Sequence, residues 1–346
     1  MSVSLPAESV EPAESVLSAE SIEPVAPPEP VAPPEPVAPP APAEPAASFE
    51  PAESVLTRNT IPLHVPDLDA RFRIKVRSLV ALFAPLMYDG LSSQVDVTAL
   101  RGRGVVSVVT HLDFRRGDAP AAVAAPLHTT VETRHSELSG EGPGHPSSRF
   151  GFDIGYTFAT PLGAGETRRY REQLSKEPRE CGEGRIVLTL LRPFGPPAER
   201  LVREPQPELA HLRLHVLEEP HPTVESLSEL GSGYVEEAVG PVEFQGRYGL
   251  QHTDVNQYVY TGEYTAVMED MATRLVAEAG LPAADHAVNR IAAVFKAPFS
   301  AGDSYVVRGR LFRDGERTVA LVGVHAVGPE GTWLRPWVFG RVEGTC

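Results

Sequence analysis

The chain has 346 residues, with 31 Lys and Arg against 46 Asp and Glu, and it carries a formal net charge of −15. Such an acidic chain is a poor nucleic-acid binder, because phosphate neutralisation requires a basic surface. No apolar run reaches the roughly 20 residues of a membrane span, and the N-terminus lacks the features of a secretory signal. Since Cys181 and Cys346 are the only cysteines, we expect no disulfide framework, no cysteine zinc site, and a cytoplasmic setting.

The N-terminal segment differs in composition from the rest of the chain. Residues 1–56 contain 14 of the 35 prolines and ten Glu, with no Lys, Arg or Asp. Proline lacks the amide N–H and fixes φ, so this stretch predicts extended polyproline II rather than helix or sheet. We expect a disordered arm over 1–57 that docks a partner, acts as a semi-rigid spacer, or is only a solubilising tail.

The first half of the body, 58–217, predicts one long helix followed by strands. Apolar side chains recur at helical spacing between Arg73 and Leu91, and Pro85 is expected to kink or end this helix. A Gly- and Pro-rich loop is expected over 139–148. Alternating patterns predict strands at 105–114, 127–133, 150–158, 185–192 and 209–217.

The second half, 241–346, repeats this order after a linker expected over 218–240. A strand within 242–250 precedes a helix whose apolar stripe runs from Tyr264 to Ala279. Further strands are predicted at 289–299, 303–313, 318–328 and 333–343. A single buried helix can cover the apolar face of an antiparallel sheet. The chain therefore predicts an α+β fold of two tandem domains, each a long helix wrapped by a curled antiparallel sheet.

A dense polar cluster, from His252 to Tyr260, directly precedes the second helix. A helix N-terminus offers free amide N–H groups and a positive dipole end, which suit an oxyanion or a thioester carbonyl. An Asp can activate a water, and an Asn can hold a carbonyl or the water in line. The simpler alternative is that Asp254 and Asn256 only cap the helix.

The run Asp254-Val255-Asn256-Gln257-Tyr258-Val259-Tyr260, followed by Tyr264, resembles the active-site segment of plant-type acyl-carrier-protein thioesterases. The strand, Gly-Asp turn and strand over 295–312 also resemble that family, as does, less closely, the pattern around Asp69 to Leu91. The resemblance covers about 60–344 and implies two hotdog domains in one chain. Asp254, Asn256 and Tyr264 match the family pattern. Tyr258 replaces the family's His, Tyr260 replaces its second Asn, and Asp270, beside Glu269, replaces its Glu.

The resemblance implies an enzyme that hydrolyses acyl thioesters of acyl carrier protein or coenzyme A, in fatty-acid or polyketide metabolism, without a cofactor or a metal. Asp254 or Asp270, the latter beside Glu269, would polarise the attacking water, and Asn256 would orient the water or the carbonyl. Tyr258 would donate to the carbonyl oxygen, and amides near 257–261 would hold the oxyanion. The expected substrate-binding side chains are Gln257, Tyr260 and Tyr264.

Two other functions stay open on the sequence alone. A dehydratase or a trans-acting tailoring enzyme on this scaffold would need a His or an acid aimed at the substrate, and His252 is the candidate. The replacement of the family's His by Tyr258 would also fit a protein that binds acyl thioesters without turnover. Two halves in one chain can supply both helices, so a monomer is sufficient. A homodimer is the other expected state.

The remaining histidines favour structural roles. His211 and His215 alternate with apolar residues, which is typical of a strand with one wet face rather than of a metal site. His111 lies in the strand predicted over 105–114, where the even-numbered side chains are expected to share one face. We therefore expect His111 to be a satisfied structural side chain.

Overall fold

The computed structural model describes residues 53–92, 95–138, 148–193, 196, 199–217, 222–254, 257–328 and 333–346. These residues belong to one compact unit, Phe49–Cys346. Almost all of the expected arm lies outside the described residues, as does the loop expected over 139–148 apart from Ser148.

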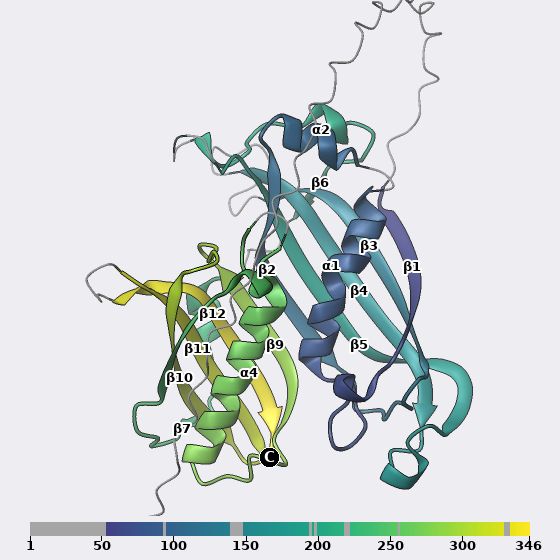
Figure 1. Cartoon of the computed structure of the whole chain (residues 1–346), viewed down its shortest axis with the longest axis vertical. Helices are drawn as coiled ribbons and strands as arrows, with labels where there is room; N and C mark the ends of the chain where they lie inside the picture. The colour runs from purple at the N-terminus through teal and green to yellow at the C-terminus, as the bar shows by residue number, and fades with distance from the viewer. Residues whose placement is uncertain are drawn as a thin grey trace, which may run out of the picture. The chain divides into compact units, whose positions relative to one another are not determined.

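The described strands form one sheet of twelve, in the order β1-β3-β4-β5-β2-β9-β12-β11-β10-β7, with β6 beside β3 and β8 beside β10 (Figure 1). All pairings are antiparallel except that of β3 with β6. The strands of the first half are β1 (Val55–Pro62), β2 (Val106–Arg116), β3 (Pro126–Leu138), β4 (Arg149–Gly163), β5 (Gln173–Leu191) and β6 (His215–Leu217). Those of the second half are β7 (Val235–Glu236), β8 (Glu243–Arg247), β9 (Ala287–Phe295), β10 (Ser304–Asp314), β11 (Arg317–Val327) and β12 (Trp333–Thr345).

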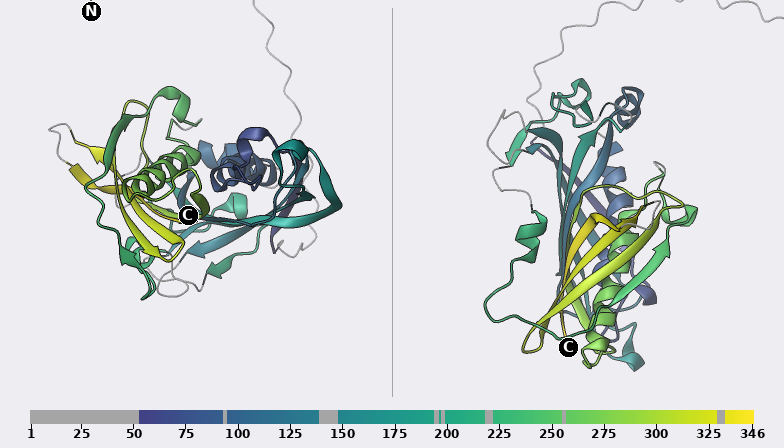
Figure 2. Two further views of the ribbon diagram at one scale, coloured as in Figure 1. Left: turned by 90° about the horizontal axis from the view of Figure 1, so that it is seen from below. Right: turned by 90° about the vertical axis from the view of Figure 1, so that its left-hand side faces the viewer.

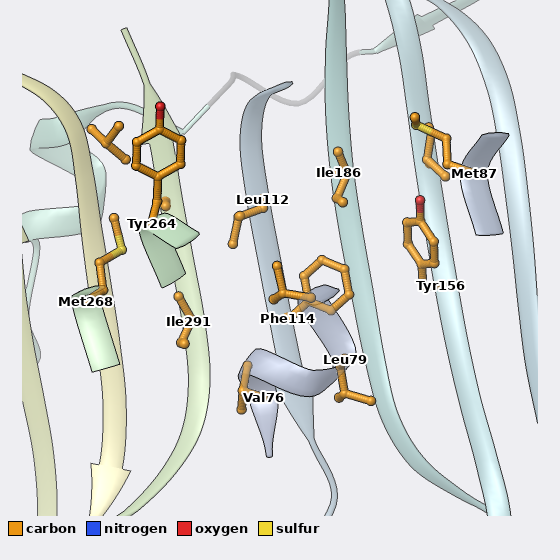
Figure 3. Close-up of a cluster of buried hydrophobic side chains, with 14 of the residues drawn as sticks. Val76, Leu79, Met87, Leu112, Phe114, Tyr156, Ile186, Tyr264, Met268 and Ile291 are labelled. Carbon is orange, nitrogen blue, oxygen red and sulfur yellow. The ribbon is translucent and has the colours of Figure 1, made fainter. Parts of the chain in front are cut away.

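Two long helices, α1 (Val76–Ser92) and α4 (Thr261–Glu278), lie side by side on one face of this sheet, which curls around them (Figures 1 and 2). Their apolar side chains point into the sheet, and Figure 3 shows Leu79 of α1 beside Phe114 and Met268 of α4 beside the strands of the second half. Leu79, Phe114 and Met268 are fully buried. Each half is therefore one helix wrapped by its own strands, as the sequence predicts. The short helices are α2 (Val97–Gly102) and α3 (Val224–Ser228), with single 3₁₀ turns at Val65–Asp67, Thr167–Arg169, Pro207–Leu209 and Leu250–His252.

Strands β2 and β9 join the two halves. Their antiparallel pairing covers His111 to Arg115 of β2. Beyond His111, β2 continues to Val106 and within the described residues pairs there with β5 alone, whereas β9 ends at Phe295. The sheet therefore forks where the two strands part, and the fork opens a gap between the halves.

A β-bulge at Thr110 lies at the root of the fork. The register of β2 against β5 shifts between Val109 and His111. Val109 and Leu112 both face the helices, because their partners on β5 lie two residues apart and share that face. The expectation that all even-numbered side chains of this strand share one face is therefore wrong. His111 lies on the face opposite the helices.

Helix α1 continues through Pro85 to Ser92, so of the two outcomes expected at Pro85, a kink or an end, the end does not occur. A proline in a helix deprives the carbonyl four residues earlier of its amide donor, and here that carbonyl belongs to Ala81. The phenol of Tyr260, at the start of α4, donates to Ala81 O at 3.0 Å. A side chain of the second half thus replaces the hydrogen bond that Pro85 removes from α1.

Three expected boundaries also differ from the structure. Strand β1 begins at Val55, inside the arm expected over 1–57. The expected strand at 209–217 is limited to His215–Leu217, since Pro207–Leu209 forms a 3₁₀ turn before it. The expected linker over 218–240 contains α3 and β7, and β7 pairs with β10.

A buried histidine of β3 lies in an apolar environment. His135 is 5% exposed, and its ring packs beside Phe150 and Phe152, with centroid distances of 6.1 and 6.0 Å. Neither ring nitrogen has a hydrogen-bond partner in the described structure. Burial, with the nearby charges of His215 and His211, lowers the pKa of His135 from 6.5 to about 4. His135 is therefore neutral in the folded protein at neutral pH.

Acidification is expected to destabilise the protein through His135. Between pH 6.5 and 4 the unfolded chain binds a proton at this position and the folded chain does not, so stability falls as the pH falls. At pH 5 the cost is at most about 2 kcal/mol relative to pH 7. His135→Phe is expected to remove this part of the pH dependence of urea unfolding. His64→Phe, at an exposed position, is the control and is expected to leave that pH dependence unchanged. An unchanged pH dependence in His135→Phe would contradict the assignment.

Candidate functional site

A cavity of about 340 Å³ lies at the fork between β2 and β9. One wall comes from α1 and the ends of β2 and β5 in the first half, and the other from the segment before α4 and the end of β9. Its apolar part faces the helices and includes Met87, Val109, Leu188 and Phe295. The cavity therefore brings together residues from both halves.

Asp254 lines this cavity from a narrow turn before α4. Its backbone N–H donates to Tyr258 O at 2.8 Å, and its Oδ1 accepts from the Tyr258 amide at 3.3 Å. Thr253 and Val259 pair as an isolated bridge across this turn. Helix α4 begins at Thr261, and its N-cap is Tyr260, so the alternative that Asp254 caps this helix is wrong. Asn256 lies outside the described residues.

Three tyrosines of the expected site line the same cavity: Tyr258, Tyr260 and Tyr264. Tyr258 is held by a bridge to Ser300 and is half-buried. The hydroxyl of Tyr260 is bonded to α1, as described above. Tyr264 is buried, and its oxygen accepts the amide hydrogen of Phe299 at 3.0 Å, while burial raises its pKa. Tyr260 and Tyr264 therefore have structural partners, whereas Tyr258 belongs to the turn itself and lines the cavity.

The amides expected to hold an oxyanion are mostly engaged within the protein. The N–H groups of residues 257–260 donate, in order, to Asp254 O, Asp254 Oδ1, Phe299 O and His252 O. The amides of residues 257–260 are therefore not available to hold an oxyanion, which corrects the expectation for 257–261 except at Thr261. Thr261 lines the cavity, and the first amides of a helix have no acceptor inside the helix.

His252 and Gln257 do not line the cavity. Nδ1 of His252 accepts the Gly249 amide hydrogen at 2.8 Å, and its ring packs edge-on against Tyr248. Gln257 is exposed at the tip of the turn, with φ of 63°, a left-handed conformation that L-residues adopt at a cost. The structure thus gives His252 a supporting role beneath the turn.

The two acidic residues on α4 also lie away from the cavity lining. Glu269 is partly buried between the long helices, and its carboxylate lies 3.5 Å from Arg77 of α1. Burial raises the pKa of Glu269, and the charge of Arg77 opposes that effect. Asp270 is exposed on the outer side of α4. Of the two, Glu269 serves as a contact between helices.

The structure adds His111 to the residues of the cavity. It is 6% exposed, and its Nδ1 lies 3.0 Å from the carbonyl of Ala293 on β9. A carbonyl only accepts, so Nδ1 carries the proton and Nε2 is the basic nitrogen of the neutral ring. Sequence patterns assign His111 to the interior of a strand. Only the pairing of β2 with β9 brings this residue to the site.

Two basic side chains, Arg149 at the start of β4 and Lys296 just after β9, complete the charged lining. Asp254 is the one carboxylate among the described lining residues. The described residues contain no group of three His, Cys, Asp or Glu that could hold a metal ion. No helix among them is both long and apolar enough to cross a bilayer.

No protein-family model matches the sequence, and no curated protein matches it. Similarity appears among solved structures. An oleoyl thioesterase (putative) from Lactobacillus plantarum aligns with a TM-score of 0.58 at 10% identity, covering 84% of this chain and 95% of that one. A 12:0-ACP thioesterase from Umbellularia californica aligns with 0.56 at 10% identity, covering 84% and 93%. An acyl-ACP thioesterase from Bacteroides thetaiotaomicron aligns with 0.51 at 13% identity, covering 84% and 97%.

These alignments extend over nearly the whole of the other chains, so the likeness includes both halves and their junction. The order of elements agrees with it, since each long helix is wrapped by its own part of one antiparallel sheet. The α+β prediction of two tandem hotdog domains is therefore confirmed: the chain has the double-hotdog fold.

Proposed function

We propose that the protein hydrolyses acyl thioesters carried on acyl carrier protein or coenzyme A. The observation that carries this proposal is the shared cavity at the fork, where Asp254 and Tyr258 lie at one wall and apolar side chains from both halves form another. A thioester requires both features, namely polar groups at the carbonyl and an apolar space for the acyl chain. The structural neighbours named above are described as thioesterases, which supports the same reaction class.

In the proposed reaction, the oxygen of a water molecule attacks the thioester carbonyl carbon while the Asp254 carboxylate takes a proton from that water. The Tyr258 hydroxyl donates a hydrogen bond to the carbonyl oxygen, and the Thr261 amide at the first turn of α4 adds a second donor. Collapse of the tetrahedral intermediate breaks the C–S bond, and the thiolate takes up the proton. The products are a carboxylic acid and the free thiol. The role expected for Asn256 remains a prediction, and Asp270, which is exposed away from the cavity lining, has no step in this proposal.

His111 is a second candidate for the base, because the family's His position is occupied by Tyr258. Its imidazole reaches the cavity from the first half of the chain, whereas Asp254 belongs to the second. The bond to Ala293 O fixes the ring so that Nε2 is the nitrogen able to accept a proton. We assign the water to Asp254 and expect His111 to support it.

Tyr258→Phe tests the assignment of the carbonyl donor. Loss of the hydroxyl is expected to lower kcat about 10- to 100-fold with little change in KM, since the bond is strongest in the transition state. The measurement is thiol release from acyl-carrier-protein and acyl-coenzyme A substrates of several chain lengths. Tyr88→Phe is the matched control, because Tyr88 lines the same cavity from α1. An unchanged kcat in Tyr258→Phe would contradict the role, and absence of thiol release from the unaltered protein would contradict the function.

A further inference from the structure

The two cationic residues of the cavity lie on the side of the sheet opposite the helices. Arg149 lies two residues before Gly151, which pairs with Thr189, so the side chains of Arg149 and Thr189 share one face. The adjacent residues Phe150 and Leu188 are buried on the helix side. Both Leu188 and Thr189 line the cavity, which therefore extends through the sheet at the fork.

Lys296 belongs to the same outer end of the cavity. Val294, two residues earlier, packs with Leu227 of α3, which covers the outer face of β9. Lys296 is exposed. Hydrogen bonds from the backbone of Glu225 and from Thr223 lower the pKa of Glu225 on α3, and the charge of Lys296 adds a smaller effect in the same direction. The outer end thus receives one cation from each half of the chain, whereas the helix side is apolar.

Arg149 differs from the other partly buried arginines of the sheet. Arg116 pairs with Asp69 at 2.9 Å, Arg185 with Asp153 at 2.8 Å, and Arg290 with Glu343 at 2.8 Å. Burial lowers the pKa of Arg149, and no carboxylate of the described residues offsets that effect. A guanidinium withdrawn from water without an anionic partner is costly. Such a position favours an external anion that supplies the missing counter-charge.

We propose that Arg149 and Lys296 bind the phosphate of the phosphopantetheine arm that carries the acyl group. The thioester carbonyl then lies at Asp254 and Tyr258, and the acyl chain occupies the apolar part of the cavity beside α1 and α4. The rest of the carrier lies outside the cavity, at the outer face of the sheet. A guanidinium presents paired donors that match phosphate oxygens, and an ammonium adds a mobile charge. This inference rests on the proposed function and extends it to the end of the substrate remote from the reacting bond.

The test compares one acyl group on two carriers, phosphopantetheine and pantetheine without the phosphate. The unaltered protein is expected to hydrolyse the phosphorylated thioester about 10- to 100-fold more efficiently in kcat/KM. Arg149→Gln and Lys296→Gln are each expected to reduce this ratio toward one, and Arg149→Lys to restore part of it. Arg58→Gln removes an exposed charge on β1 and is expected to keep the full ratio.

Binding of phosphopantetheine itself, measured by calorimetry, separates this proposal from the hydrolytic one. Binding that requires Arg149 and Lys296 but occurs without any turnover would support the anion site and overturn the proposed hydrolysis. Hydrolysis with equal efficiency on both carriers would overturn the anion site and leave the hydrolysis intact. The phosphate site would also be overturned if the Arg149 and Lys296 variants lost activity only on acyl groups that end in a carboxylate. The anion bound by these residues would then belong to the acyl chain. Because Lys296 is exposed, Lys296→Gln keeps the test valid if Arg149 variants fold poorly.

Discussion

Asp254→Asn is expected to reduce thiol release from acyl thioesters by at least about 100-fold, the lower end of what a positioned general base contributes. The amide cannot accept a proton from water at neutral pH, but it retains an oxygen that can accept the Tyr258 amide hydrogen now bound by Oδ1 at 3.3 Å. The turn before α4 is therefore expected to survive the change. The measurement is the single-turnover rate with saturating acyl-carrier-protein substrate, which separates chemistry from binding.

Asp270→Asn is the matched control for this experiment. The sequence resemblance aligns Asp270 with the family's Glu, and the structure exposes Asp270 on α4. The same change of carboxylate to amide is expected to leave the rate within about twofold, because a surface charge far from the substrate is screened. A full loss in Asp270→Asn, with activity kept in Asp254→Asn, would exchange the two roles.

The outcome for Asp254 also decides between catalysis and binding. An enzyme of the proposed kind loses turnover in Asp254→Asn while it keeps most of its affinity for a thioether analogue of the substrate. A protein that only binds acyl thioesters would show no turnover before the change and the same affinity after it. A dehydratase would release no thiol but would alter the acyl group, which mass analysis of the recovered substrate detects.

Much of the fold follows from local sequence patterns. The step of three and four residues from Tyr264 onward predicts α4, and its buried side chains occupy those positions. Alternation predicts most strands to within a few residues. What local patterns do not contain is the pairing of β2 with β9, because it joins residues about 180 positions apart. The fork depends on that pairing, and the Thr110 bulge depends on the register of β2 against β5. The sequence therefore predicts one shared face for the even-numbered side chains of β2, whereas the bulge divides them between two faces.

The candidate site was only partly predictable for the same reason. The segment from Asp254 to Tyr264 is local, and its resemblance to a known family identifies residues that do line the cavity. His111 and Arg149 reach the cavity from β2 and β4, and neither belongs to a motif. Pro85 illustrates the reverse case, since a local rule predicts a kink or an end and the helix continues. The hydrogen bond from Tyr260 to Ala81, made by a residue 179 positions away, satisfies the carbonyl that Pro85 leaves without a donor.

Asp69→Ala is expected to lower the free energy of unfolding by about 3–5 kcal/mol, as is typical when one partner of a buried ion pair is removed. Its Oδ1 accepts the amides of Arg71 and Arg73, and its Oδ2 accepts from Arg73 Nε at 3.0 Å and Arg116 Nη1 at 2.9 Å. Arg116, whose side chain is 1% exposed, also donates to Asn289 of β9 at 2.7 Å. The carboxylate thus holds the segment before α1, the end of β2 and the second half together.

Acid should weaken this network, as urea unfolding at several pH values can measure. Burial acts to raise the pKa of Asp69, but the hydrogen bonds from Arg73 and the charges of Arg116 and Arg73 outweigh it and lower the pKa. The stabilisation is therefore present above the ordinary pKa of 3.8 and is lost as the pH falls through the lowered value. Asp118→Ala is the control, since Asp118 lies 3.7 Å from the same Arg73 but is 90% exposed, and its loss should cost less than about 1 kcal/mol. Equal losses in the two variants would show that burial of Arg116 contributes nothing, and the account of the junction would then be wrong.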